Sequence, residues 1–176
     1  MLRVRLFLAS NRKEVRFFFL FVLYFVLGQL FLHLIASHTA YFLMTHNAKM
    51  SSRIINILTP AEKSSARGNQ IKGPKNFTLN IKKGCDGMEG ILLVTAAICA
   101  FYMEAKKKIL GILTGSLIIY LSNLLRIIAL YYTLKYHPGM FDVMHIYIGQ
   151  IIIILIGVVF FITWAGRFKR FDEQTS

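Results

Sequence analysis

A cysteine flanked by glycines stands immediately before a long apolar run, in residues 84–90 with the sequence GCDGMEG. Near the start of a helix, unpaired backbone N–H groups and the positive end of the helix dipole favour a thiolate. Gly84 and Gly87 allow the backbone to turn and leave room for a substrate peptide. This position makes Cys85 a candidate nucleophile.

Two later apolar runs carry polar groups that can act together with a thiol. Arg126 is the only basic residue inside an apolar run, where an ionised group costs several kcal/mol or more, so it should have a partner or a task. Asn123, three residues earlier, lies on the same helical face and can orient the guanidinium. His145 opens the last apolar run, where an imidazole can exchange a proton with a thiol or a leaving group.

The composition indicates a polytopic membrane protein. Of 176 residues, 56% are hydrophobic, and the mean hydropathy is +0.56. Soluble domains seldom exceed about 50% apolar content, and the apolar residues here form runs near the 20 or so needed to cross a bilayer. We therefore expect an all-α membrane protein, a bundle of about four transmembrane helices in a single domain spanning 1–176. The expected spans are about 17–36, 88–103, 109–134 and 143–164.

The first run follows a basic N-terminal stretch, as the apolar core of a signal peptide does. It extends over residues 17–36, whereas signal-peptide cores are only about 7–15 residues long. No convincing small-x-small cleavage site closes it. The run is therefore expected to be a retained first span.

Residues 38–84 form the one substantial extramembrane segment. Ser51 and Ser52 can cap a short helix with an apolar face, which we expect to lie on the membrane surface. Residues 61–69 have the composition of a flexible linker. Residues 77–81 alternate between apolar and polar side chains, which indicates a half-buried strand, and Gly73-Pro74 before them is a turn signal compatible with a small β-hairpin.

A seam of small residues runs along the third span. Gly111 and Gly115 form a GxxxG pattern, which permits close approach of another helix. Ser122 and Ala129 follow at intervals of seven residues and extend the same seam.

The basic segments predict the orientation. With four spans, the N-terminus, the loop containing Lys106–Lys108 and the C-terminal tail share one side, and short basic segments favour the cytoplasm. Residues 38–84 also carry eight Lys and Arg residues. The two sides therefore differ in the local density of basic residues rather than in their number. We expect a multi-pass protein of the cytoplasmic (inner) membrane with cytoplasmic termini. The net charge is +13, and the charged residues lie between the apolar runs. This placement indicates anionic membrane lipids, rather than nucleic acid, as the partner of the protein.

This topology brings the three candidate groups to one depth. Cys85 precedes the outer end of the second span, and His145 lies at the outer end of the fourth. Arg126 lies about 12 Å below the outer end of the third span at 1.5 Å per residue, and its long side chain reaches upward. The active site is thus expected on the extracytoplasmic side, and reversing the topology would preserve the convergence.

Each group also has a structural interpretation. Arg126 can pair with Glu89 or Asp86 simply to hold the bundle together, and both acids can offset a helix dipole. Cys99 is expected to be an apolar filler. It lies about 21 Å from Cys85 if the intervening residues are helical, too far for a disulfide. The sequence contains no metal-ligand cluster or nucleotide-binding loop, so no metal or cofactor is expected.

Three motifs occur in one order along the chain: C-x-G at 85–87, N-x-x-R at 123–126 and H-x-x-x-G at 145–149. This ordered set resembles the exosortase/archaeosortase family of membrane transpeptidase-like proteases, over roughly residues 75–160. The chain is most similar to the compact exosortase H type. The resemblance implies cleavage of a C-terminal sorting signal, which consists of a short motif, a transmembrane helix and a basic tail, on membrane-anchored exported proteins.

The resemblance also implies roles for individual residues. Cys85 is the implied nucleophile that forms a thioester, His145 the acid/base, and Arg126 the group that stabilises the oxyanion or positions the peptide. Resolution of the thioester by an amine would make a transpeptidase, and resolution by water a protease. The residues with an implied supporting or substrate-binding role are Asn123, Glu89, Gly87 and Gly149.

Two other classes of protein compete with this interpretation. A non-enzymatic membrane assembly or export factor would use Arg126 and Glu89 as a structural pair, and Cys85 would then be dispensable. A thiol-quinone oxidoreductase would need a cysteine pair, and the chain has no CxxC motif.

Overall fold

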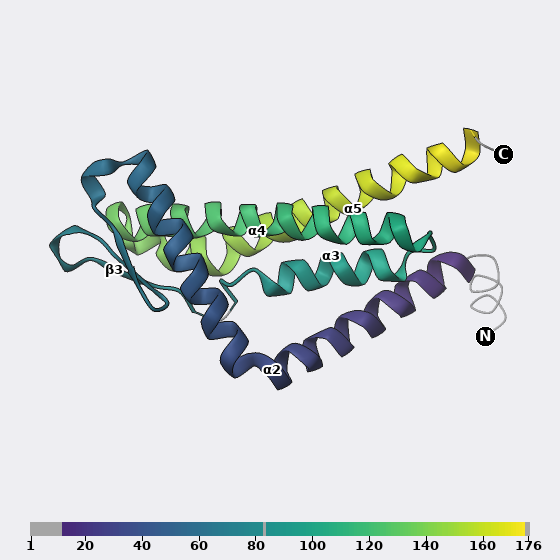
Figure 1. Ribbon diagram of the computed structural model, residues 1–176, viewed down its shortest axis with the longest axis horizontal. Helices are drawn as coiled ribbons and strands as arrows, with labels where there is room; N and C mark the ends of the chain where they lie inside the picture. The colour runs from purple at the N-terminus through teal and green to yellow at the C-terminus, as the bar shows by residue number, and fades with distance from the viewer. Residues whose placement is uncertain (1–11, 83, 175–176) are drawn as a thin grey trace.

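The computed structural model describes residues 12–82 and 84–174, which form an elongated helical molecule (Figure 1). Three helices run side by side: α3 (Met88–Ala100), α4 (Ala105–Tyr136) and α5 (Gly149–Gln174). A long helix, α2 (Arg12–Leu58), runs beside them and then turns across one end of the bundle. A small sheet lies at that end, which we call the sheet end. The expected all-α membrane architecture with a small strand-containing segment is confirmed.

Among the described residues, three helices are long and apolar enough to cross a membrane, and a fourth apolar helix is shorter. The candidate spans are Arg12–Leu34, Ala105–Tyr136 and Val143–Arg167. The third predicted span, 109–134, lies within α4. The fourth, predicted at 143–164, begins as a π-helix, η4 (Val143–Ile148), and continues as α5.

The second predicted span is shorter than expected. Its helix, α3, has 13 residues and ends at Ala100 rather than at residue 103. At 1.5 Å per residue α3 is about 20 Å long, less than the roughly 30 Å of a hydrocarbon core. The residues just before α3 therefore lie alongside its longer neighbours and do not reach the level of the neighbours' ends.

Helix α2 is the largest departure from expectation. It continues for 47 residues, so the predicted helix at 51–58 is its last two turns and not a separate surface helix. Residues 37–50 contain no Gly or Pro, so nothing local ends the helix. Ser51 and Ser52 are buried inside α2 rather than capping it, and Ser52 Oγ lies 3.0 Å from Ser64 Oγ. Figure 1 shows that α2 bends between its two arms.

The extramembrane segment contains a three-stranded antiparallel sheet in the order β1-β2-β3, formed by β1 (Ser65–Arg67), β2 (Gln70–Lys72) and β3 (Thr78–Asn80). Strand β1 lies in residues 61–69, so the prediction of a flexible linker there is wrong. Gly68, with φ +58°, supplies the tight turn between β1 and β2 that propensity alone does not reveal. The predicted strand is confirmed as β3, and η2 (Pro74–Asn76) forms the predicted turn before it.

A buried polar cluster attaches the sheet end to α4. Glu62, in the short helix η1 (Pro60–Glu62), is only 3% exposed. Its carboxylate accepts a hydrogen bond of 2.9 Å from the Tyr131 hydroxyl and forms an ion pair with Lys135. The hydrogen bond from Lys135 holds the pKa of Glu62 below its ordinary value, although burial opposes this shift. The segment before β1 is thereby fixed to the end of α4.

Two hydrophobic clusters form the core. The cluster at the sheet end combines residues of α2, the sheet and α4, and it includes Cys85; the other lies between α3, α4 and α5. Close packing in the second cluster depends on glycine. A Cβ on Gly111 would lie 2.5 Å from the Trp164 side chain, and one on Gly115 would lie 2.6 Å from Phe160. The predicted GxxxG contact is therefore made with α5, and at Gly115 also with Val94 of α3.

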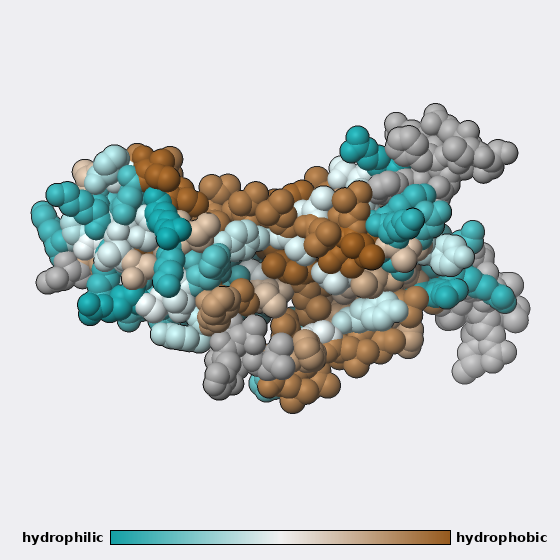
Figure 2. Space-filling view, in the orientation of Figure 1, coloured by the Kyte–Doolittle hydropathy of each residue, from teal (hydrophilic) through white to brown (hydrophobic). Residues whose placement is uncertain are grey.

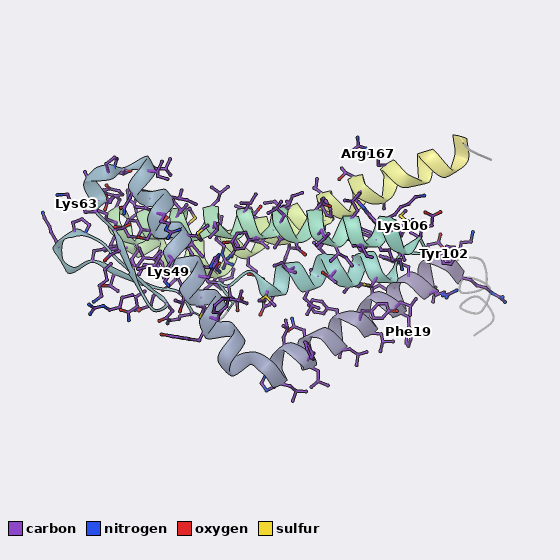
Figure 3. The ribbon with its side chains drawn as sticks, viewed as in Figure 1. Phe19, Lys49, Lys63, Tyr102, Lys106 and Arg167 are labelled. Carbon is purple, nitrogen blue, oxygen red and sulfur yellow. The ribbon has the colours of Figure 1, made fainter. Side chains whose placement is uncertain are left out.

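Polarity follows the long axis. In Figure 2 an apolar belt lies between two hydrophilic ends. Figure 3 shows Lys63 at the sheet end and Lys106 and Arg167 at the opposite end. The start of α2, the turn between α3 and α4 and the end of α5 lie together at that opposite end (Figure 1), as a four-span topology requires.

Candidate active site

The loop before α3 presents Cys85. Gly84 and Gly87 have φ values of +86° and +84°, a left-handed conformation that glycine adopts without strain. The Cys85 N–H donates to the Lys82 carbonyl at 3.1 Å, and the Asp86 carboxylate accepts from the Met88 N–H at 3.2 Å. Asp86 thus satisfies one of the free N–H groups at the start of α3.

The thiol of Cys85 lies against the imidazole of His145. The distance from Sγ to Nδ1 is 3.2 Å, and from Sγ to Nε2 it is 4.0 Å. His145 belongs to the π-helical η4, an element that often marks functional sites. The Phe141 ring stacks on the imidazole, with 5.5 Å between centroids and 10° between planes. Two residues 60 positions apart in the chain are therefore held at hydrogen-bonding distance.

The guanidinium of Arg126 joins the two segments that carry this pair. Its Nη2 donates to the His145 carbonyl at 2.9 Å, and its Nη1 donates to the Gly84 carbonyl at 3.3 Å. Its Nε is buried without a hydrogen-bond partner among the described residues. A single cation thus fixes the backbone on both sides of the thiol–imidazole contact. The predicted convergence of Cys85, Arg126 and His145 is present in the fold.

Two of the sequence-predicted glycines make room for this arrangement. A Cβ on Gly149 would lie 2.6 Å from Arg126 Nε, so only glycine at this position leaves space for the Arg126 side chain. A Cβ on Gly87 would lie 3.1 Å from the Asn123 side chain. Both positions contribute space rather than a functional group.

Two asparagines hold the cysteine loop from the side of α2 and α4. Asn123, fully buried, donates from Nδ2 to the Cys85 carbonyl at 2.9 Å. The sequence reasoning expected Asn123 to orient Arg126, and the structure shows a different partner. Asn47, 1% exposed, donates to the Asp86 carbonyl at 3.1 Å. The sequence did not single out Asn47, because residues 38–84 were expected to form an extramembrane segment. Only the bend of α2 brings the second arm of this helix, which contains Asn47, to the loop before α3.

The alternative structural pair does not form. Arg126 and Glu89 make no ion pair among the described residues; Glu89 is exposed in the first turn of α3. That placement suits the other interpretation of Glu89, in which a carboxylate near the helix start interacts favourably with the dipole.

A small cavity of about 90 Å³ lies beside the thiol. It is lined by Cys85 and His145 together with residues of β3, α4 and the segment before η4. Such a space is large enough for one or two side-chain groups of a peptide but not for a folded domain.

Comparison with known proteins identifies the family of this chain. Residues 4–163 match the family model described as transmembrane exosortase (Exosortase_EpsH). The chain belongs to the transmembrane exosortase family. No curated protein and no solved structure matches it. The membrane-spanning helices and the family membership together show that this exosortase is a multi-pass membrane protein.

The electrostatics of the exosortase site favour a protonated thiol at rest. Burial raises the pKa of the Cys85 thiol above its ordinary value; the nearby Arg126 guanidinium opposes the shift, and the Asp86 carboxylate adds to it. Desolvation thus outweighs the opposing effect of the Arg126 guanidinium. Chemically, the arrangement can pass the thiol proton to His145 Nδ1 when a substrate arrives.

The second cysteine lies apart from this site. Cys99 is near the opposite end of α3, and both cysteines are free. Its carbonyl accepts a hydrogen bond from Lys108 Nζ at 2.8 Å. In the described part of the chain, no group of three or more His, Cys, Asp or Glu side chains has the geometry to hold a metal ion.

Proposed function

We propose that this exosortase is a membrane cysteine transpeptidase or protease that cleaves the C-terminal sorting signal of membrane-anchored exported proteins. One observation carries the proposal: the buried Cys85 Sγ lies 3.2 Å from His145 Nδ1. A thiol and an imidazole at this separation form the nucleophile–base pair that acyl transfer requires.

The reaction proceeds through two acyl transfers. His145 Nδ1 takes the proton of the Cys85 thiol while Sγ attacks the carbonyl carbon of the scissile peptide bond. The tetrahedral intermediate collapses, the imidazolium gives its proton to the departing amine, and the C–N bond breaks to leave a thioester on Cys85. An acceptor amine, or water, then attacks the thioester and restores the thiol, which gives transpeptidation or hydrolysis respectively.

Arg126 acts as a positioning residue in this proposal. Its two hydrogen bonds to the Gly84 and His145 carbonyls favour that role over direct stabilisation of the oxyanion. Asn123 of α4 and Asn47 of α2 complete the support of the loop that carries Cys85, through the Cys85 and Asp86 carbonyls.

We further propose that the termini are cytoplasmic and that the site faces the outer side of the cytoplasmic membrane. The short basic segments at the end opposite the sheet support this orientation. A reporter fused after Lys107 should therefore be accessible only from the cytoplasm; an external reporter would reverse the assignment.

The proposal is tested by following alkylation of the protein by a membrane-impermeant thiol reagent against pH. Labelling from outside should require Cys85, and its pH profile should change in His145→Ala. In parallel, Cys85→Ala should abolish processing of a tailed substrate, whereas Cys99→Ala, the matched cysteine control, should leave processing intact. A labelling profile indifferent to His145, or processing that survives Cys85→Ala, would show that no nucleophile–base pair operates here.

A further inference from the structure

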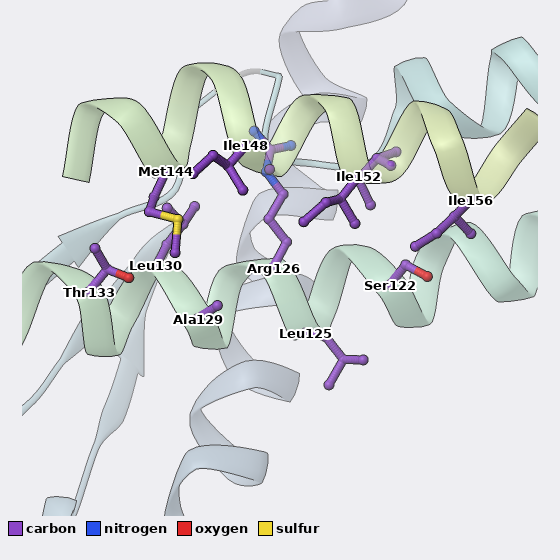
Figure 4. A pocket seen from close by; sticks show the side chains of 12 residues that line it. Ser122, Leu125, Arg126, Ala129, Leu130, Thr133, Met144, Ile148, Ile152 and Ile156 are labelled. Carbon is purple, nitrogen blue, oxygen red and sulfur yellow. The ribbon is translucent and has the colours of Figure 1, made fainter. Parts of the chain in front are cut away.

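A second and larger cavity lies between α4 and the helical segment formed by η4 and α5. It measures about 250 Å³ and is lined almost entirely by apolar side chains (Figure 4). It reaches from Ser122 to Thr133 along α4, a distance of about 16 Å at a rise of 1.5 Å per residue. We call this cavity the α4–α5 groove. Its lining residues belong to the two candidate spans that contain α4 and α5, so the groove lies within the membrane.

The small-residue seam of α4 is only partly used inside the bundle. Gly115 is covered by Phe160 of α5. Ser122 and Ala129, seven and fourteen residues further along, instead line the α4–α5 groove, and Ala129 is exposed. Small side chains at this spacing allow the close approach of another helix. Among the described residues, no helix of this chain occupies that position.

Arg126 lines the groove as its one charged residue. In Figure 4 its side chain rises from α4 across the groove toward the first turns of α5. The same guanidinium donates to the carbonyls of Gly84 and His145, and Leu130 lines both this groove and the cavity beside the thiol. The groove therefore adjoins the candidate active site directly.

We propose that the α4–α5 groove binds the transmembrane helix of the sorting signal and delivers the outer end of that helix to Cys85. This inference rests on the proposed function and assigns a binding site for its substrate. The apolar walls accept the side chains of the helix, and Ser122 and Ala129 let it approach α4. Where the substrate unwinds toward the scissile bond, a main-chain carbonyl accepts a hydrogen bond from the Arg126 guanidinium.

Arg126, which lines the groove and is only partly buried, favours a peptide over a lipid chain as the occupant. An acyl chain brings no hydrogen-bond acceptor to a guanidinium, whereas an unwound peptide brings one carbonyl oxygen per residue. A guanidinium has five N–H donors, and the Gly84 and His145 carbonyls accept from one on Nη1 and one on Nη2. Each Nη carries a second N–H, which can donate to such a carbonyl.

The test uses the full protein reconstituted in phosphatidylcholine vesicles with a probe peptide of 20 apolar residues followed by an arginine-rich tail. A photoreactive residue replaces Leu125, on the groove, or Leu117, its matched control. Both residues are lipid-exposed on α4, at 65% and 56%, but Leu117 does not line the groove. Crosslinking to the peptide should be several-fold greater from position 125 than from position 117. Equal crosslinking, or capture only of lipid or of a second copy of the protein from position 125, would overturn the proposal.

A second variant tests the shape of the groove. Ala129→Phe fills it and should raise the peptide concentration needed for half-maximal crosslinking about tenfold, whereas Leu117→Phe should leave that concentration unchanged. A cooperative thermal unfolding transition in detergent verifies that each variant is folded, and unchanged peptide binding in folded Ala129→Phe would also overturn the proposal. Because crosslinking needs no cleavage, an inactive Cys85 would refute the proposed chemistry while groove binding is still measured.

Discussion

Replacing Gly149 by alanine tests whether the placement of Arg126 controls the site. Gly149 has ordinary helical dihedrals, φ −62° and ψ −37°, so helix propensity alone predicts that alanine stabilises the protein by about 1 kcal/mol. The structure predicts the opposite sign. The new Cβ would lie 2.6 Å from Arg126 Nε and 2.9 Å from the Met144 carbonyl oxygen, and both contacts are too close to persist.

The magnitude follows from the hydrogen bonds of the guanidinium. If Arg126 moves and loses one of its two bonds to backbone carbonyls, the free energy of unfolding falls by about 1.5–3 kcal/mol. Subtracting the propensity gain of about 1 kcal/mol leaves a net loss of about 0.5–2 kcal/mol. If Cys85 and His145 act as proposed, a displacement of either group by about 1 Å should also reduce the rate of processing about 100-fold.

Thermal unfolding in detergent and processing of a tailed substrate measure the two effects. Gly166→Ala is the matched control, because Gly166 lies in the same helix and a Cβ there would meet nothing within 4 Å. It should be neutral or slightly stabilising and fully active. If Gly149→Ala behaves like Gly166→Ala in both measurements, the contacts of Arg126 do not control the site.

Three further predictions follow from the same geometry. Arg126→Ala removes the positive charge that opposes the raised pKa of Cys85, so alkylation of the thiol at a fixed pH near 8 should become slower; faster labelling would contradict this. Asn47→Ala leaves the Asp86 carbonyl without its donor and should lower the free energy of unfolding by about 1–3 kcal/mol, with processing reduced as well; an unchanged melting temperature would show that the contact is dispensable. Because the folded pKa of Glu62 is depressed, its stabilisation is present above the ordinary value near 4.3 and is lost as the pH falls through the folded value. Thermal unfolding across that range should show a weaker pH dependence in Glu62→Gln than in the wild type, and equal slopes would count against the pair.

The membrane architecture could be predicted because its signals are local. An apolar run of given length specifies a helix of given length, so three of the predicted spans correspond to helices that are long enough to cross. The strand at 77–81 and the turn at Gly73-Pro74 were also predicted, since alternation and turn residues act over a few positions. The strand β1 was not, because its turn depends on Gly68 adopting a positive φ.

Predictions failed where a residue's partner comes from elsewhere in the chain. Residues 37–58 could continue α2 or form a separate surface helix with similar propensity, and packing against the sheet and α4 decides for α2. The continuation of α2 brings Asn47 to the loop before α3 that carries Cys85. No local pattern distinguishes a buried asparagine that binds a distant carbonyl from one in an exposed loop.

Helix rise and apolar run length are enough to predict that Cys85, Arg126 and His145 come together, and in the structure these three residues are in contact. Which of their atoms face one another depends on side-chain packing, which no local sequence pattern shows. The rotation of each helix depends on how its side chains pack, and here the missing side chain of Gly149 lets the guanidinium cross from α4 to the His145 carbonyl. Asn123, one turn away from Arg126 on the same helix, consequently points to the Cys85 carbonyl instead.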